Sequence, residues 1–191
     1  EMIDAGIIVC IAAGNRSNKI DVSGGTDYNN YYTSNGSDEY YHRGSSPFST
    51  RAFIVGNLDS TSASATNDQK ATSSETGPGV NIYAPGTNIM SCTSNTNRFT
   101  DASYAFPAYN DTDWRQCNIS GTSMASPQVA GVVALYLQIN PTATPDEIRT
   151  AIINDAGTAI LNTGTSNDWT NDRSLKGGNA KVLFNKFNKS E

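Results

Sequence analysis

Three short apolar stretches of the chain predict buried β-strands. Residues 7–12 are continuously apolar, residues 52–59 are apolar for most of their length, and residues 81–85 follow the same trend until a Pro-Gly pair. Runs without apolar–polar alternation are typical of strands covered on both faces, as in parallel sheets. We therefore expect a largely parallel sheet whose first strand follows a short helical turn ending at Gly6.

Two further predicted strands lie on either side of a polar loop. Residues 88–92 and 117–120 are expected to pair as a ribbon, and the loop of about 93–116 that joins them is polar and rich in aromatic residues. Residues from about 16 to 50 hold many Asn, Ser, Gly and Tyr residues with no sustained period. This composition favours turns, so the segment is predicted to be a long surface insertion.

A long helix is predicted after the ribbon. Its apolar positions occupy most sides of the helix, which predicts a central, buried helix rather than a surface one. We expect it to end before Asn140, because the proline that follows disfavours the α conformation at that residue. The apolar positions are Val129, Val132, Val133, Leu135, Tyr136, Leu137 and Ile139.

A second helix carries clear signals at both ends. Thr144 fits the N-cap, Pro145 the first helical position and Glu147 the third position of a capping box. Three apolar residues then fall on one face, and residues 154–157 are expected to end the helix. Strands and helices in this order predict an α/β fold.

Composition limits the classes of function. The chain has 191 residues, which suits one domain or part of one. Its 13 Lys and Arg against 18 Asp and Glu give a formal charge of -5 without any basic run, so nucleic acid is not an expected partner. No apolar run reaches the roughly 18 residues of a membrane helix, and no signal-peptide pattern follows residue 1. No membrane interaction is predicted.

The three cysteines form neither a disulfide framework nor a CxxC metal pattern. Cys10, on the first predicted strand, is expected to be a small core residue. Cys92 and Cys117 lie near the ends of the predicted ribbon, where they either face one another in a disulfide or remain separate thiols. The sequence leaves both arrangements open.

Ser123 stands where a polar loop turns into the long predicted helix. A nucleophilic serine needs an exposed oxygen, small neighbours that let a substrate carbonyl approach, and amide donors for the oxyanion that forms. Gly121 and Ala125 supply small neighbours, and the unpaired N–H groups at a helix start favour negative charge beside Ser123. The simpler alternative is that Ser120, Thr122 or Ser123 only caps the helix.

Three segments share the order and residues of a known family. They are VCIAAGN at 9–15, FIVGNLDS with ATSSETGPGVNIYAPG at 53–60 and 71–86, and GTSMASPQVAG at 121–131. In this order they resemble the oxyanion-asparagine strand, the next strand with its APG turn, and the nucleophile motif of the subtilisin-like serine proteases, or subtilases. The resemblance implies a parallel-sheet, subtilisin-like α/β fold and a serine endopeptidase that hydrolyses polypeptides.

Carried onto this sequence, the resemblance makes Ser123 the catalytic nucleophile and Asn15 the side-chain donor to the oxyanion. A neutral amide suits that place because it donates a hydrogen bond without adding a charge that must be desolvated. The resemblance also implies that Ala12, Ala13 and Gly14 form one wall of the substrate-binding pocket, where small side chains leave room. Close packing at the end of a strand is the alternative reason for these three residues.

The family's aspartate and histidine motifs are missing from this sequence. In the family both come before the asparagine strand, so we expect them upstream of Glu1, on an N-terminal subtilase portion that is this chain's partner. His42 is the only histidine, and its surroundings, DEYYHRGSS, do not resemble the histidine motif, so we interpret it as a loop residue. Residues 1–191 are therefore interpreted as the C-terminal portion of a subtilase catalytic domain, with upstream strands missing and no activity alone.

No cofactor is expected and no metal ligand is assigned. Many subtilases bind calcium, but the acidic residues here form no loop of the D-x-D-x-D-G type. Gly79 and Asn81 stand where a cation site before the APG stretch would favour carboxylates. The acidic residues considered are Asp21, Asp27, Asp38, Glu39, Asp101, Asp111 and Asp113.

Two functions of different classes stay open. One is a serine endopeptidase that is part of a larger or two-piece protein, and the other is a non-catalytic, subtilase-like binding or assembly module. The intact serine and asparagine motifs favour the first, because a scaffold has no reason to keep both. A hydrolase of the G-x-S-x-G type is disfavoured, since Ala125 stands at the second glycine's position. The compartment is not fixed by the sequence, and the resemblance alone favours secretion.

Overall fold

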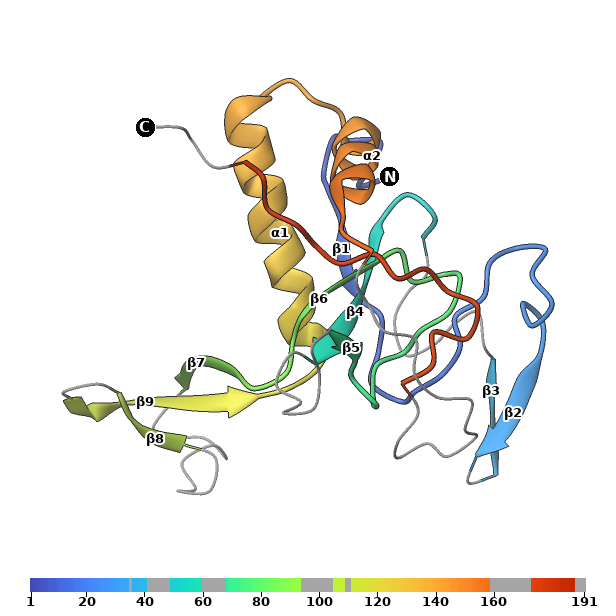
Figure 1. Ribbon diagram of the computed structural model, residues 1–191, viewed down its shortest axis with the longest axis horizontal. Coiled ribbons are helices and arrows are strands. Elements are labelled where there is room, and N and C mark those ends of the chain that lie inside the picture. The colour runs from blue at the N-terminus through green and yellow to red at the C-terminus, as the bar shows by residue number, and fades with distance from the viewer. Residues whose placement is uncertain are drawn as a thin grey trace.

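The computed structural model describes residues 1–34, 36–40, 49–59, 68–93, 105–108, 111–158 and 173–187. Its central sheet is built around β4 (Phe53–Asp59), which pairs in parallel with β1 (Cys10–Ala12) on one edge and with β6 (Ile82–Pro85) on the other. The short β5 (Gln69–Lys70) runs antiparallel to the last two residues of β4. The predicted parallel sheet is confirmed, and Figure 1 shows it at the centre of the chain.

Two helices cover one face of this sheet. Alternate residues of β4, Phe53 and Val55, pack with α1 (Thr122–Ile139) and α2 (Pro145–Asp155) in one hydrophobic cluster. Ile54 and Leu58 point to the other face and join a second cluster. Both faces of β4 are thus buried, as in other strands of parallel sheets, although Asn57 and Asp59 interrupt its apolar residues. On the outer edge of β6, the Tyr83 N–H donates to the Lys181 carbonyl at 2.8 Å, so the C-terminal segment covers that edge.

The first strand is shorter and less buried than the sequence predicts. Strand β1 includes only Cys10–Ala12, its residues are half-buried, and Ile7 is 48% exposed. Within the described part of the chain, β4 is the only strand paired with β1. A parallel strand is buried fully only when both of its edges are paired and both faces covered, and here one edge stays open. Partial burial raises the pKa of the Cys10 thiol to about 11.

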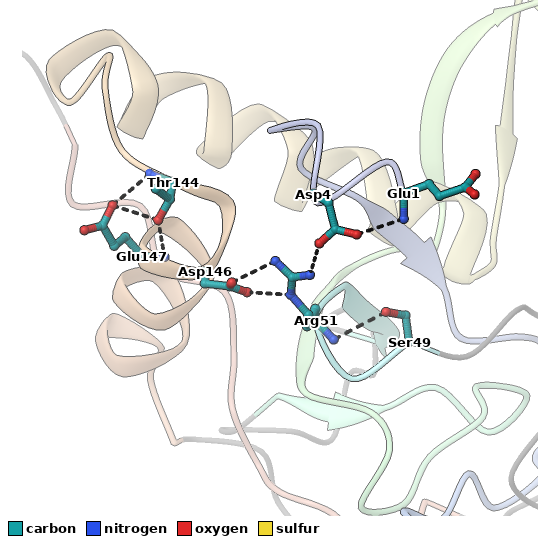
Figure 2. A network of polar contacts seen from close by, with 7 residues as sticks. All are labelled: Glu1, Asp4, Ser49, Arg51, Thr144, Asp146 and Glu147. Carbon is teal, nitrogen blue, oxygen red and sulfur yellow. Dashed lines mark hydrogen bonds and ion pairs between the residues drawn. The ribbon is translucent and has the colours of Figure 1, made fainter.

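Both helices form where they are predicted. Helix α1 ends at Ile139, before the Asn-Pro pair, but it is not buried on most sides, because Leu135 and Ile139 are 37% and 52% exposed. Val129, Val132 and Val133 join the first hydrophobic cluster with the sheet, whereas the side of α1 that carries Leu135 and Ile139 stays exposed among the described residues. Helix α2 has the predicted capping box, in which Thr144 accepts from the Glu147 N–H and Glu147 accepts from the Thr144 N–H (Figure 2).

The predicted ribbon is larger than the sequence suggests. Strand β9 (Asp111–Ile119) pairs antiparallel with β7 (Ile89–Thr93) on one side and with β8 (Ala105–Ala108) on the other. The predicted loop of about 93–116 therefore contains one whole strand and most of another, which corrects that boundary. A ribbon that projects from the body needs no continuous apolar face, so it leaves little hydrophobic pattern in the sequence (Figure 1).

The ribbon register excludes a disulfide between Cys92 and Cys117. Cys117 lies opposite Ser91, and Cys92 lies opposite Gln116. Neighbouring residues of a strand point to opposite faces, so the two sulfur atoms are on opposite faces of the ribbon. All three cysteines are free thiols.

The predicted surface insertion of about 16–50 begins inside the fold. Ile20 joins the second hydrophobic cluster, and the Asp21 carboxylate is buried, where it accepts from the Val22 and Asp27 N–H groups and pairs with Lys19. These tertiary contacts have no periodic signal in the sequence. Further along, β2 (Tyr31–Ser34) and β3 (Ser37–Tyr40) form a hairpin that projects from the body, as expected of an insertion (Figure 1).

Candidate active site

Asn15 and Ser123 lie together at the carboxyl ends of the parallel strands. Asn15 is the third residue after β1, and Ser123 is the second residue of α1, which runs back along the sheet from that end (Figure 1). Both residues are exposed. The carboxyl end of a parallel sheet is where open α/β folds place their ligand sites.

Thr122 joins the two segments. Its N–H donates to the Asn15 Oδ1 atom at 2.9 Å, and its hydroxyl accepts from the Gly14 N–H at 3.1 Å. The same hydroxyl also donates a hydrogen bond to Asn15 Oδ1 at 3.3 Å. Thr122 is fully buried, although the residue next to it is exposed. This bridge between residues 107 positions apart fixes the end of β1 against the start of α1.

The bridge also fixes the orientation of the Asn15 amide. Because a backbone N–H is only a donor, the atom that faces Thr122 must be the amide oxygen. The Nδ2 group is therefore the end of Asn15 that can donate to a ligand. Gly121, at the N-cap of α1, has no side chain to cap the helix, so the Ser123 N–H meets no capping group within the described residues. The Asn15 side chain, the Ser123 N–H and the positive end of the helix dipole are thus brought to the start of α1, where the Ser123 hydroxyl lies.

A close backbone contact holds the start of α1 against the end of β6. The Gly121 N–H donates to the Gly86 carbonyl at 2.8 Å. A Cβ atom on Gly86 would lie 2.6 Å from Asn57 Oδ1, 2.7 Å from the Gly121 carbonyl oxygen and 3.0 Å from the Ala125 Cβ. No side chain fits there, so Gly86 is required for this approach.

The three residues of the predicted pocket wall occupy different environments. Ala12 is half-buried at the end of β1, and the Ala13 side chain is fully buried in the second hydrophobic cluster. Gly14 is buried, and its N–H and carbonyl both bond within the chain, the carbonyl accepting from the Glu75 N–H at 2.9 Å. Close packing therefore accounts for Ala13, while the assignment of these residues to a substrate pocket stays a prediction.

Among the described residues there is neither a histidine base for Ser123 nor a cluster of metal-binding side chains. His42 lies outside the described residues, so none of those described can act as a histidine base for Ser123. Asn81 uses its side chain on the backbone of β4, accepting from the Ile54 N–H at 3.0 Å and donating to the Ala52 carbonyl at 3.1 Å. In the part of the chain that the structure describes, His, Cys, Asp and Glu side chains nowhere gather in threes. No described helix is long and apolar enough to span a membrane.

Sequence reasoning missed the role of Thr122. It treated this residue as one of three possible helix caps, whereas its N–H and hydroxyl link Asn15 and Gly14. The only signal was its place beside Ser123 in an eleven-residue motif. Nothing local in the sequence indicates a contact with residue 15.

Comparison with known proteins places these features in a family. Residues 1–183 match the model of the subtilase family, Peptidase_S8. Serine protease AprX of Bacillus subtilis is 35% identical over 161 residues, which cover 81% of this chain and 31% of that protein. The extracellular protease of Xanthomonas campestris is 40% identical over 101 residues, covering 52% of this chain and 16% of that protein. The chain thus spans less than a third of these relatives.

A solved structure supports the same grouping at the level of the fold. Fervidolysin from Fervidobacterium pennivorans, described as a keratinolytic enzyme related to subtilisin, superimposes with a TM-score of 0.60 at 23% identity. The match covers 97% of this chain and 22% of that one. Identity at this level shows a shared subtilisin-like fold, of which this chain forms one part.

Proposed function

The chain belongs to the subtilase family, and we propose that it is the C-terminal part of a serine endopeptidase domain in which Ser123 is the nucleophile. The observation that carries the proposal is the 2.9 Å hydrogen bond from the Thr122 N–H to Asn15 Oδ1. It holds the Asn15 amide by its oxygen at the start of α1, one residue before the exposed Ser123, and leaves the amide nitrogen as the donor end. An amide and a helix N-terminus beside a hydroxyl suit a reaction that develops an oxyanion.

The proposed reaction is acyl transfer from a polypeptide. Ser123 Oγ attacks the scissile carbonyl carbon while its proton passes to a histidine base. The carbonyl oxygen becomes an oxyanion, which accepts hydrogen bonds from Asn15 Nδ2 and the Ser123 N–H. The C–N bond then breaks, the amine leaves with the proton from the histidine, and an ester on Ser123 remains for water to hydrolyse. The reaction needs no cofactor.

We propose that the histidine and its aspartate come from an N-terminal portion of the same catalytic domain. The open edge of β1 supports this proposal, because the N–H and carbonyl groups along it can pair with a further parallel strand. The partial exposure of Ile7 supports it too, since a neighbouring strand would cover that side chain. Without that portion, the described residues offer Ser123 no histidine base, and residues 1–191 alone are expected to be inactive.

Secretion is proposed on the relatives alone. The Xanthomonas protein is named an extracellular protease.

The test is covalent labelling of Ser123 by an organophosphorus probe. The intact protein is expected to be labelled at Ser123, the Ser123→Ala variant to stay unlabelled, and residues 1–191 alone to label poorly. Ser126→Ala is the matched control, because Ser126 lies one turn further along α1 and should not alter labelling. A folded intact protein that resists the probe would favour the non-catalytic module, and strong labelling of residues 1–191 would contradict the upstream base.

A further inference from the structure

Lys70 is a fully buried lysine surrounded by backbone carbonyl groups. Its Nζ atom donates to the carbonyl oxygens of Ala71 at 2.9 Å, Thr72 at 3.3 Å and Ser74 at 3.2 Å. No part of the side chain is exposed to solvent. Lysine is almost never fully buried unless its charge is compensated. An ammonium has three N–H donors, and three carbonyl oxygens of one turn are within reach of them.

The turn around Lys70 is bonded to the segment that holds Asn15. The Glu75 N–H donates to the Gly14 carbonyl at 2.9 Å, and the Ser17 N–H donates to the Ser73 carbonyl at 2.9 Å. The Ser17 hydroxyl also donates to the Thr72 carbonyl at 2.6 Å. The residues before and after Asn15 are therefore tied to the same turn that surrounds the ammonium.

The sheet explains why the two segments meet. Strands β1 and β5 pair with the same edge of β4, β1 with Phe53 to Val55 and β5 with Leu58 and Asp59. From Gly14 onward the first segment no longer pairs with that edge of β4. Strand β5 pairs with the same edge further along β4, at Leu58 and Asp59. The turn that follows Lys70 thus lies directly beyond the end of β1, next to the residues on either side of Asn15.

Three carbonyl oxygens point at one position, and their dipoles repel one another unless a cation lies between them. The Ala71 carbonyl also accepts from the Ser74 N–H at 3.0 Å and the Thr72 carbonyl from the Ser17 hydroxyl, so the ammonium is a second donor to these two oxygens. A buried carboxylate, Glu75, ends the same turn and adds negative charge to the region. A lysine supplies a cation that is covalently attached, so no free ion has to be bound.

We propose that the Lys70 ammonium is a built-in cation that sets the conformation of residues 71–75, and through it the position of Asn15. Lys70 is then a positioning residue for the oxyanion donor, a part of the inference that rests on the proposed function. Removal of the lysine side chain leaves a site lined by backbone carbonyl oxygens, which can replace the hydration shell of a monovalent cation such as potassium, and we expect ammonium or potassium to bind there.

The experiment compares variants of the intact protein in chloride salts of equal ionic strength. In tetramethylammonium chloride, Lys70→Ala is expected to melt at a lower temperature than wild type and to lose about 10- to 10²-fold in kcat, with KM little changed. Ammonium or potassium should restore part of both, because these ions fit the carbonyls and tetramethylammonium does not. Lys70→Met should lose stability and kcat without recovery in any salt, since its side chain fills the space without a charge.

Lys181→Met is the matched control. Lys181 donates from a half-buried position to the Ile153 carbonyl at 2.6 Å, away from Asn15, so its loss should show no preference among the cations. The proposal is wrong if Lys70→Ala responds equally to all three cations, or if Lys70→Met keeps wild-type stability and kcat. Should Lys70→Ala fail to fold in every salt, Lys70→Met decides alone. Cation-specific recovery of the melting temperature in a protein without peptidase activity would support the built-in cation and contradict the proposed function.

Discussion

At the residue scale, the site depends on which end of one amide is used. Asn15 Oδ1 accepts from the Thr122 N–H, so the oxygen has a structural task, and the nitrogen is the end to which the proposed function assigns the oxyanion. An aspartate at this position could accept the same bond but could donate nothing. The two tasks of Asn15 can therefore be separated by substitution.

Asn15→Ala and Asn15→Asp are expected to lower kcat of the intact enzyme by at least about 10²–10³, with a smaller change in KM, because both lack the donor to the oxyanion. This range was measured on subtilisin, a member of the same family. Only Asn15→Ala should also lower the urea midpoint, because it removes the acceptor of the Thr122 N–H. Steady-state kinetics and urea unfolding measure the two effects. An unchanged kcat in both variants would rule out Asn15 as the oxyanion donor.

At the scale of elements, the position of Ser123 follows from how closely α1 begins against β6. Gly86 allows this contact because it has no Cβ, and the Gly121 N–H completes it through a 2.8 Å hydrogen bond. Gly131, in the middle of α1, is not crowded, because a Cβ there would meet no atom within 4 Å outside the helix's own backbone. These two glycines therefore predict opposite responses to the same substitution.

Gly86→Ala is expected to destabilise the protein by about 1–3 kcal/mol, because the new methyl group meets backbone and buried atoms. Gly131→Ala is expected to stabilise it by about 0.5–1 kcal/mol, because alanine favours the helix more than glycine does. Urea unfolding of the two variants and wild type measures both. A neutral Gly86→Ala would show that α1 and β6 can separate without loss.

At the scale of the whole molecule, a surface network joins three segments at the end of the sheet opposite Ser123. Arg51, just before β4, donates to Asp146 at the start of α2 through two bonds of 3.2 and 2.9 Å, and to Asp4 at 2.6 Å (Figure 2). The hydrogen bonds from Arg51 lower the pKa of both carboxyl groups and raise the pKa of the guanidinium.

These shifts fix the sign of a pH effect. Both carboxyl pKa values are lower in the folded chain than the ordinary 3.8, so the network stabilises the fold above that pH. The stabilisation is lost as the pH falls through the lowered values. Arg51→Gln should therefore reduce the urea midpoint at neutral pH, and the difference from wild type should shrink in acid and in high salt.

The reduction is expected to be small, because all three side chains are exposed. Arg51→Lys keeps the charge but loses the paired bonds to Asp146, so its midpoint should fall between those of wild type and Arg51→Gln. A difference that persists unchanged at low pH would mean that Arg51 acts through packing of its stem rather than through its charge.

Much of this protein was determined by sequence that is local along the chain. The mostly apolar stretch of β4, the Thr144 and Glu147 capping box and the Asn-Pro stop of α1 each depend on neighbouring residues, and each formed as predicted. The motifs around Asn15 and Ser123 are local too, which is why the family was visible before the fold.

The contacts between residues that are far apart in the sequence were decided only by the tertiary structure. The Thr122 bridge to Asn15, the burial of Lys70 and the register that separates Cys92 from Cys117 join residues that the sequence spaces irregularly. The open edge of β1 and the exposed face of α1 also depend on what packs beside them. Propensity and periodicity describe each element's own faces, whereas burial and hydrogen bonding depend on which other element supplies the partner atoms.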